Sequence, residues 1–222
     1  VLALFNAGVV AGSEDQLMYI NTAENSAIGF IFGAERPPFY PFLVWFFGVT
    51  GMLVFQVVID SFECVIMAKA FCDAGLSIRS AKIFGILYSI NPLFIICSGL
   101  LLSDSIFVFE FSLAIYCFVK WIRSDSDLYI LLMIVCFGLM AMTRTIGLYI
   151  GVVMICFVFG IFFRSWTVDR WRVACSGVLV FFLILSPQYI FNQVNHDSFA
   201  FSAQTGTHLR HWVFPSIYQL SG

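Results

Sequence analysis

Long apolar runs separated by short polar clusters make up most of the 222-residue chain. The runs are continuous rather than alternating, which argues against a transmembrane β-barrel, and about 20 apolar residues suffice for a helix to cross a membrane. We therefore predict an all-α fold, a multi-pass transmembrane helical bundle. The predicted spans cover residues 50–71, 81–101, 104–122, 127–143, 146–163 and 172–190, and a partial first span ends near residue 11.

Two polar segments complete the predicted layout. Residues 12–49 form a first outer loop, and residues 191–222 form an outer segment after the last visible span. The chain begins at Val1 with an apolar run that is too short to span, so we expect a fragment from the N-terminal part of a longer protein. We expect residues 1–222 to form a single transmembrane domain.

The composition excludes a soluble domain. Hydrophobic residues make up 61% of the chain and charged residues 11%, whereas soluble domains contain about 25% charged residues. The seven cysteines show no CxxC or Cys/His metal spacing, so we interpret them as small buried side chains rather than a disulfide framework. We predict contact with membrane lipids and no nucleic-acid partner.

The 11 basic residues divide unequally between the two sides of the predicted bundle, eight against three. The positive-inside rule makes the eight-residue side cytoplasmic, so both polar segments face outward. The three outer basic residues are Arg36, Arg144 and Arg210. Each is either an interfacial arginine that snorkels to headgroups, or the three contribute to a site for an anion such as phosphate, which the planar guanidinium binds through paired hydrogen bonds.

The first outer loop begins with a predicted helix. Residues 13–16, "SEDQ", match a capping box, and Leu17 and Ile20 start an approximate apolar face, so we predict a short helix in the membrane interface. The three prolines of "ERPPFYPF" (35–42) then predict a stiff, extended segment that holds Arg36 at a fixed depth.

Glu14 and Asp15, at the start of this helix, have two interpretations. Acids in the first turn of a helix complement its dipole and often do nothing else. Alternatively, a carboxylate that the dipole keeps ionised at the outer surface, near a phosphate-binding arginine, accepts a proton from an incoming hydroxyl or amine.

Three acids lie inside the predicted spans: Asp60, Glu63 and Glu110. Asp60 and Glu63 are three residues apart and share one helix face. Such groups are costly in lipid and usually point into the bundle. They either form a proton or ion path, as in a transporter, or are protonated or hydrogen-bonded between helices, with Gln56 and Asn91 as candidate partners.

Two motifs in the first loop resemble the multi-pass glycosyltransferases of the GT-C fold, in the branch of protein O-mannosyltransferases and the lipid A aminoarabinose transferase. Those proteins carry an acidic motif similar to D-E-x-x-Y, and "EDQLMY" (14–19) places Asp15 and Tyr19 in register. Gln16 replaces the second acid, and Glu14 precedes the first instead. Their basic residue followed by Pro-Pro and Tyr resembles "RPPFY" (36–40).

The resemblance continues in order along the chain. "INPLFIICSGLLLSDSIFVF" (90–109) resembles a proline-containing span with an acid where Asp104 stands. "GLMAMTRTIGLYI" (138–150) resembles a Gly-rich span that ends in Thr-Arg, and "FNQVNHDSFAFSAQTGTHL" (191–209) resembles a later outer segment.

The resemblance implies an inverting transfer of a sugar from a polyprenyl-phosphate donor to a glycan, lipid or protein acceptor at the outer face. It implies that Asp15 is the catalytic base, with Glu14 beside it, and that Arg36 and Arg144 bind the lipid phosphate. The further substrate-site residues that it implies are Tyr19, Tyr40, Glu35 and Asp104. We expect Asp15, Arg36 and Arg144 to converge around one cavity that opens to the outer face.

The resemblance also implies a location, the inner membrane of a bacterium with the active site facing the periplasm, or the ER membrane in a eukaryote. A divalent metal ion is compatible with so many acids, but no ligand spacing requires one. Two alternatives remain: a transporter or flippase of lipid-linked glycans that uses the acids inside the spans, and a non-catalytic accessory membrane subunit, which the Gln16 departure keeps open.

Overall fold

The computed structural model of the chain describes residues 14–25, 32, 36–164 and 168–202. Within these residues every regular element of secondary structure is an α-helix, as predicted. The helices are α2 (Glu14–Asn25), α4 (Phe39–Asp73), α5 (Ile78–Ser89), α6 (Pro92–Ser98), α7 (Asp104–Ser124), α8 (Asp127–Thr143), α9 (Thr145–Arg164) and α10 (Val168–His196). The predicted partial first span lies outside the described residues.

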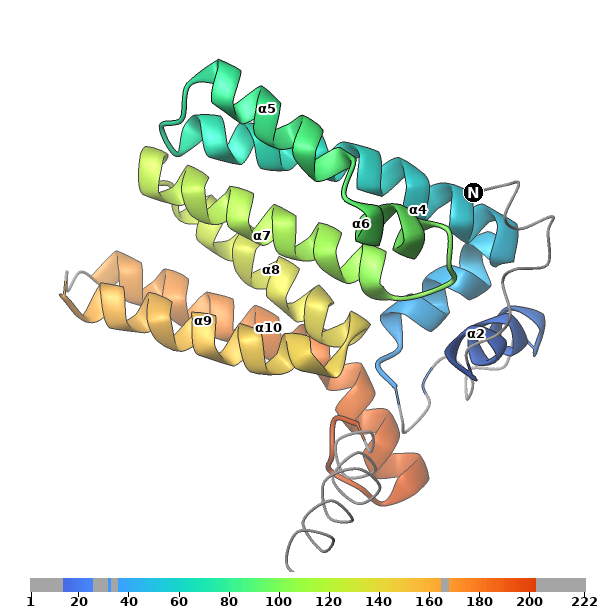
Figure 1. The fold of residues 1–222 in the computed structure, drawn as a ribbon. Helices are drawn as coiled ribbons and strands as arrows, with labels where there is room; N and C mark the ends of the chain where they lie inside the picture. The colour runs from blue at the N-terminus through green and yellow to red at the C-terminus, as the bar shows by residue number, and fades with distance from the viewer. Residues whose placement is uncertain (1–13, 26–31, 33–35, 165–167, 203–222) are drawn as a thin grey trace, which may run out of the picture.

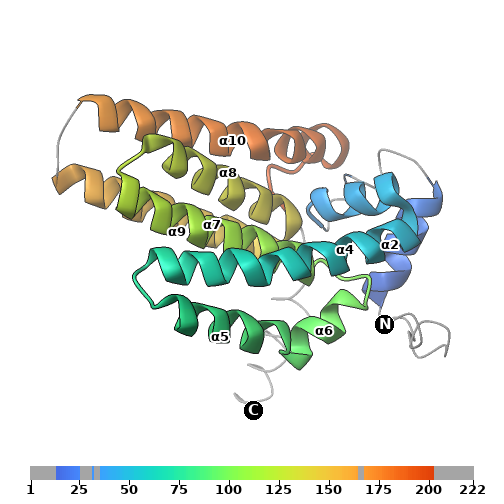
Figure 2. The same ribbon diagram turned by 90° about the horizontal axis from the view of Figure 1, so that it is seen from above.

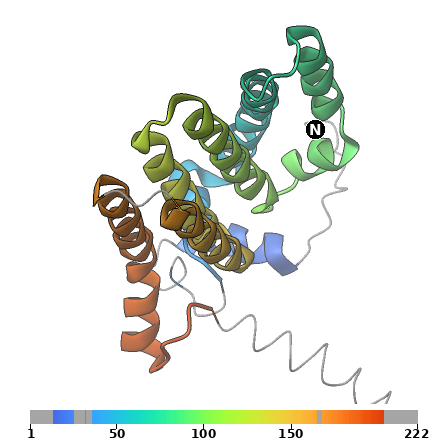
Figure 3. The ribbon, with the colours of Figure 1, turned by 90° about the vertical axis from the view of Figure 1, so that its left-hand side faces the viewer.

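The longer helices run roughly alongside one another, while α2 lies beside the end of the bundle at which α4 and α7 begin and α8 ends (Figure 1). The helices α7 and α8 occupy the middle, α5 lies at one edge beside α4, and α10 lies at the opposite edge (Figures 2 and 3). Three described helices are long and apolar enough to cross a membrane, namely Phe39–Asp73, Asp104–Ser124 and Trp171–His196, and α8 and α9 are shorter apolar helices. The predicted helical membrane bundle is therefore confirmed.

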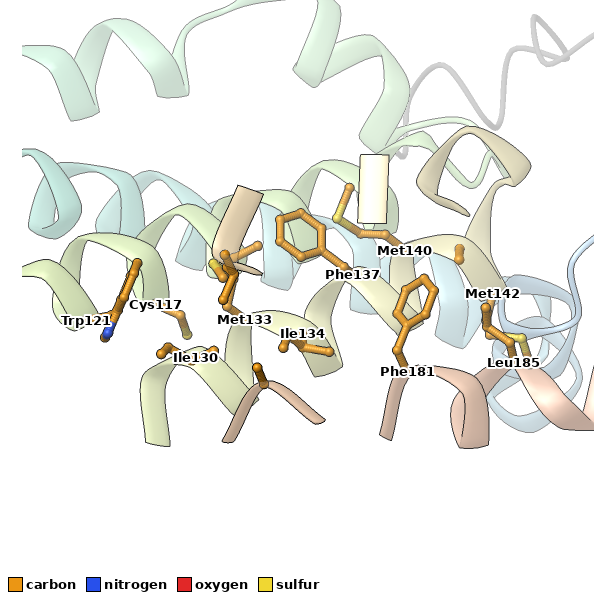
Figure 4. Close-up of a cluster of buried hydrophobic side chains, with 14 of the residues drawn as sticks. Cys117, Trp121, Ile130, Met133, Ile134, Phe137, Met140, Met142, Phe181 and Leu185 are labelled. Atoms are coloured by element: carbon orange, nitrogen blue, oxygen red, sulfur yellow. The ribbon is translucent and has the colours of Figure 1, made fainter. Parts of the chain in front are cut away.

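The centre of the bundle is an apolar cluster formed mainly by α7, α8 and α10. It includes Trp121 from α7, Met133 and Phe137 from α8, and Phe181 and Leu185 from α10 (Figure 4). Many large apolar side chains outside this cluster face outward, such as Phe46 and Val65 of α4 and Val194 of α10. An apolar exterior around an apolar core is what a helix bundle in lipid requires.

The helix after the first loop is longer than predicted, because it begins at Phe39 rather than near residue 50. It bends at Gly48, whose φ of 68° and ψ of 168° lie outside the helical region and favour glycine. Pro41 falls in the first turn of this helix, where its missing N–H has no intrahelical partner to lose. The prediction of an extended chain at Pro41 was therefore wrong.

The predicted span 81–101 is not one continuous helix. It consists of α5 and α6, which are separated at Ile90 and Asn91. Pro92 is the physical reason, since proline removes a backbone donor and disfavours a helical conformation in the residue before it. The other predicted spans, 104–122, 127–143, 146–163 and 172–190, match α7, α8, α9 and α10.

Candidate functional site

The helix α2 begins at Glu14, where the capping pattern predicts it, and packs on α4. Its buried positions are Gln16 and Tyr19, whereas Leu17 is exposed, so the predicted apolar face is only partly right. The side chains of Glu14 and Asp15, and residue Glu35, lie outside the described part of the structure.

Tyr19 connects α2 to both Arg36 and Tyr40. Its ring meets the Tyr40 ring edge to face, with 4.5 Å between centroids. The Arg36 guanidinium lies 5.7 Å from the centroid of the same ring, within the range of a cation–π contact, and its Nη1 donates to the Tyr19 hydroxyl at 3.4 Å. Three predicted site residues are thus in direct contact.

Tyr40 is fully buried and is held from the opposite side by Gln56. The Tyr40 hydroxyl donates to Gln56 Oε1 at 3.0 Å, and Gln56 Nε2 donates to the carbonyls of Leu100 at 3.0 Å and Leu102 at 3.4 Å. These bonds attach α4 to the turn that leads into α7. Because Asp104 begins α7, they also fix the position of that acid.

Asp104 and Arg144 form an ion pair. Asp104 lies in the first turn of α7, where the helix dipole favours a negative charge. Arg144 is the extended residue between α8 and α9, with φ −144° and ψ 141°. Their side chains are 42% and 41% exposed, so both remain accessible to a ligand.

The elements that carry the two groups of site residues, α2 with the start of α4 and the start of α7 with the end of α8, lie at the same end of the bundle (Figure 1). Leu101 and Ile106, on either side of Asp104, belong to the same apolar cluster as Tyr19 and Tyr40. Phe39 packs against both this cluster and the central one. The predicted convergence of Asp15, Arg36 and Arg144 on one cavity stays a prediction, because the side chain of Asp15 lies outside the described part.

The acids Asp60 and Glu63 belong to a separate polar cluster inside the bundle. Glu63 accepts hydrogen bonds from Ser112 Oγ at 2.7 Å and from the Tyr88 hydroxyl, and Ser105 Oγ lies 3.3 Å from Asp60 Oδ2. Both acids line a cavity of about 150 Å³. These carboxyl groups are thus hydrogen-bonded between helices, as one of the two sequence interpretations expected.

Sequence reasoning missed the partners of these acids. Gln56 bonds instead to Tyr40 and the backbone. Ser105 and Ser112 are seven residues apart on α7, which places them on one helix face, and this spacing was the available signal. Among the residues that the structure describes, no group of three or more His, Cys, Asp or Glu is placed to hold a metal ion.

A family model described as dolichyl-phosphate-mannose-protein mannosyltransferase matches residues 35–201. This range contains Arg36, Tyr40, Asp104 and Arg144, and it begins after "EDQLMY". No curated protein and no solved structure matches the chain.

Proposed function

The chain belongs to the dolichyl-phosphate-mannose-protein mannosyltransferase family, and we propose that it transfers its sugar at the outer face of the membrane, with inversion at the anomeric carbon. The family makes it a membrane glycosyltransferase that uses a polyprenyl-phosphate sugar. The acceptor is a protein, glycan or lipid. The outer face is the end of the bundle that holds Arg36 and Arg144.

The lipid phosphate is assigned to Arg144 and Arg36. Arg144 pairs with Asp104 through Nη1, and a guanidinium carries five N–H donors in all. Asp104 therefore orients the guanidinium while further donors remain for a phosphate. Negative charge grows on the phosphate as it leaves, and fixed donors stabilise that charge without reorganising.

Asp15 is the proposed base. It lies in the first turn of α2, about one helical turn before Tyr19, which contacts Arg36. The acceptor oxygen or nitrogen attacks the anomeric carbon, the bond from that carbon to the phosphate oxygen breaks with its electron pair going to the phosphate, and Asp15 takes the acceptor proton. One displacement gives one inversion.

The remaining predicted residues have supporting places in this scheme. Tyr40 is fully buried and bonded to Gln56, so we assign it the support of Tyr19 rather than contact with the sugar. Glu14, Glu35 and Asp104 shape the sugar or acceptor site. The part of the first loop that precedes α4 and the segment that follows α10 supply the surface that the acceptor meets.

The observation that carries this proposal is the family match over residues 35–201. The geometry supports the choice of end, because Arg36 contacts Tyr19 of α2 and Arg144 pairs with Asp104 in the first turn of α7, and α2 lies beside the end of the bundle at which α7 begins (Figure 1).

The test uses full-length protein in lipid nanodiscs with radiolabelled polyprenyl-phosphate sugars and an envelope acceptor fraction. We expect the wild type to transfer label and Asp15→Asn to lose transfer by about 100-fold or more, the range of a general base. The matched control is Asp127→Asn, which changes another first-turn acid at the opposite end of the bundle. Equal losses in both variants would mean that Asp15 acts only through the helix dipole.

A further inference from the structure

Glu110 is a buried acid of α7 that faces the last residue of α8. Glu110 and Thr143 are 4% and 3% exposed. Thr143 Oγ1 lies 3.0 Å from Glu110 Oε1 and 2.9 Å from Oε2, and it also lies 2.9 Å from the carbonyl of Leu139. Neither residue takes part in the chemistry described above.

The number of protons defines how these groups bond. Thr143 has one hydroxyl proton, and the Leu139 carbonyl is only an acceptor. A charged Glu110 would depend on that one proton in a buried site, which is costly. A neutral Glu110 donates to Thr143, and Thr143 then donates to Leu139, so that both protons are used. The geometry therefore fits a carboxylic acid that acts as a hydrogen-bond donor.

The next residue in the chain is Arg144. The helix α7 thus holds two consecutive residues, Thr143 through Glu110 and Arg144 through Asp104. The chain leaves the helical conformation between them, since Arg144 is extended. Two attachments to one rigid helix determine where the Arg144 side chain starts and in which direction it points.

We propose that Glu110 is a positioning residue for Arg144, acting through Thr143, and that it sets the affinity of the protein for the phosphate of a polyprenyl-phosphate lipid. This inference rests on the proposed function, in which Arg144 binds that phosphate. Glu110 touches no substrate. A displacement of about 1 Å at a binding group is enough to weaken its action strongly.

The test measures binding of polyprenyl phosphate, the lipid product, to the full chain in nanodiscs, so that it does not depend on turnover. Thr143→Val removes the hydroxyl at constant shape, and Glu110→Leu with Thr143→Val replaces both partners by apolar groups, which avoids an unpaired buried acid. We expect each to weaken binding about tenfold. Thr143→Ser keeps the hydroxyl, and Glu110→Gln keeps a hydrogen-bond donor at position 110. For each of these variants we expect binding of polyprenyl phosphate within about twofold of wild type.

A double-mutant cycle with Arg144→Ala separates positioning from general destabilisation. If Glu110 acts through Arg144, adding Thr143→Val to Arg144→Ala changes binding by less than about twofold. If the effects of Thr143→Val and Arg144→Ala on the dissociation constant multiply, the inference is overturned and the proposed function stands. The same holds if Thr143→Val lowers the melting temperature but leaves binding unchanged. Absence of wild-type binding overturns the proposed function, and this inference with it.

Discussion

Tyr40 and Gln56 have no exposed surface, yet both carry polar groups. Their hydrogen bond, together with the two bonds from Gln56 to backbone carbonyls, satisfies these groups where α2, α4 and the start of α7 meet. Tyr40 contacts Arg36 only indirectly, through the Tyr19 ring. These hydrogen bonds and the ring contact fix the positions of α2, α4 and the start of α7 relative to one another beneath the proposed site.

Removing the Tyr40 hydroxyl should destabilise the protein more than removing that of Tyr19. In Tyr40→Phe the buried Gln56 Oε1 loses its donor, which costs about 1–3 kcal/mol. In Tyr19→Phe the lost bond is the 3.4 Å contact with Arg36, which is long for a hydrogen bond. Melting temperatures of the two variants in one detergent test this, and an equal or larger drop for Tyr19→Phe contradicts the account.

Site residues could be predicted from the sequence where they belong to a local motif. They could not be predicted where they depend on a contact between residues that are far apart in the sequence. "RPPFY" pointed to Arg36 and Tyr40 because its residues are adjacent. The pairing of Asp104 with Arg144 spans 40 residues of sequence, and no local pattern encodes it. Glu110 was recognised as a costly acid, but its bond to Thr143 depends on how α7 and α8 pack.

At the scale of elements, the close approach between α8 and α9 decides where Arg144 lies. A Cβ atom built on Gly147 would come within 2.4 Å of the carbonyl carbon and oxygen of Met140. Backbone atoms cannot move aside as a flexible side chain does, so this tight turn requires glycine. The turn also contains a hydrogen bond from the Gly147 N–H to the Arg144 carbonyl at 2.9 Å.

Gly147→Ala should therefore lower stability and impair donor binding together. We expect a loss of about 1–3 kcal/mol from overpacking, although alanine is the better helix former by about 1 kcal/mol. Gly160→Ala in the same helix is the matched control, because nothing lies within 4 Å of the added atom, and it should be neutral or slightly stabilising. Thermal melting of the two variants checks this, and a neutral Gly147→Ala would contradict the described turn.

Helices were predicted well where apolar runs ended at polar residues, as with α7, which ends near "RSDSD", and α8. The errors came from proline. Proline at the first turn is compatible with a helix, so α4 starts earlier than its prolines suggested. Proline after Asn91 breaks the helical path, so an apolar run of span length became α5 and α6. Hydropathy alone does not distinguish these two effects.

At the scale of the whole molecule, two ion pairs mark opposite ends of the bundle. Lys120 pairs with Asp73 at 2.8 Å where α4 and α7 end, and Arg144 pairs with Asp104 where α7 begins. The charge count along the sequence assigned these ends to different sides of the membrane. The family match identifies the activity. From the positions of Arg36 and Arg144 we propose which end of the bundle holds the active site.

The most direct measurement of this claim is photo-crosslinking of polyprenyl phosphate, the lipid product, to the two ends of the bundle. Phe39, at the start of α4, and Phe118, toward the end of α7, are both partly buried against the central apolar cluster. Each is replaced by benzoylphenylalanine in the full-length protein in nanodiscs, and polyprenyl [³²P]phosphate is the probe. Unlabelled polyprenyl phosphate and polyprenol serve as competitors.

We predict an adduct at Phe39 that polyprenyl phosphate suppresses and polyprenol does not, because the phosphate supplies the recognised charge. We predict no such adduct at Phe118. Asp15→Asn should keep the Phe39 adduct, since the base does not bind the phosphate, and Arg144→Ala should lose it. A phosphate-specific adduct at Phe118, or equal adducts at both positions, would contradict the placement of the donor site.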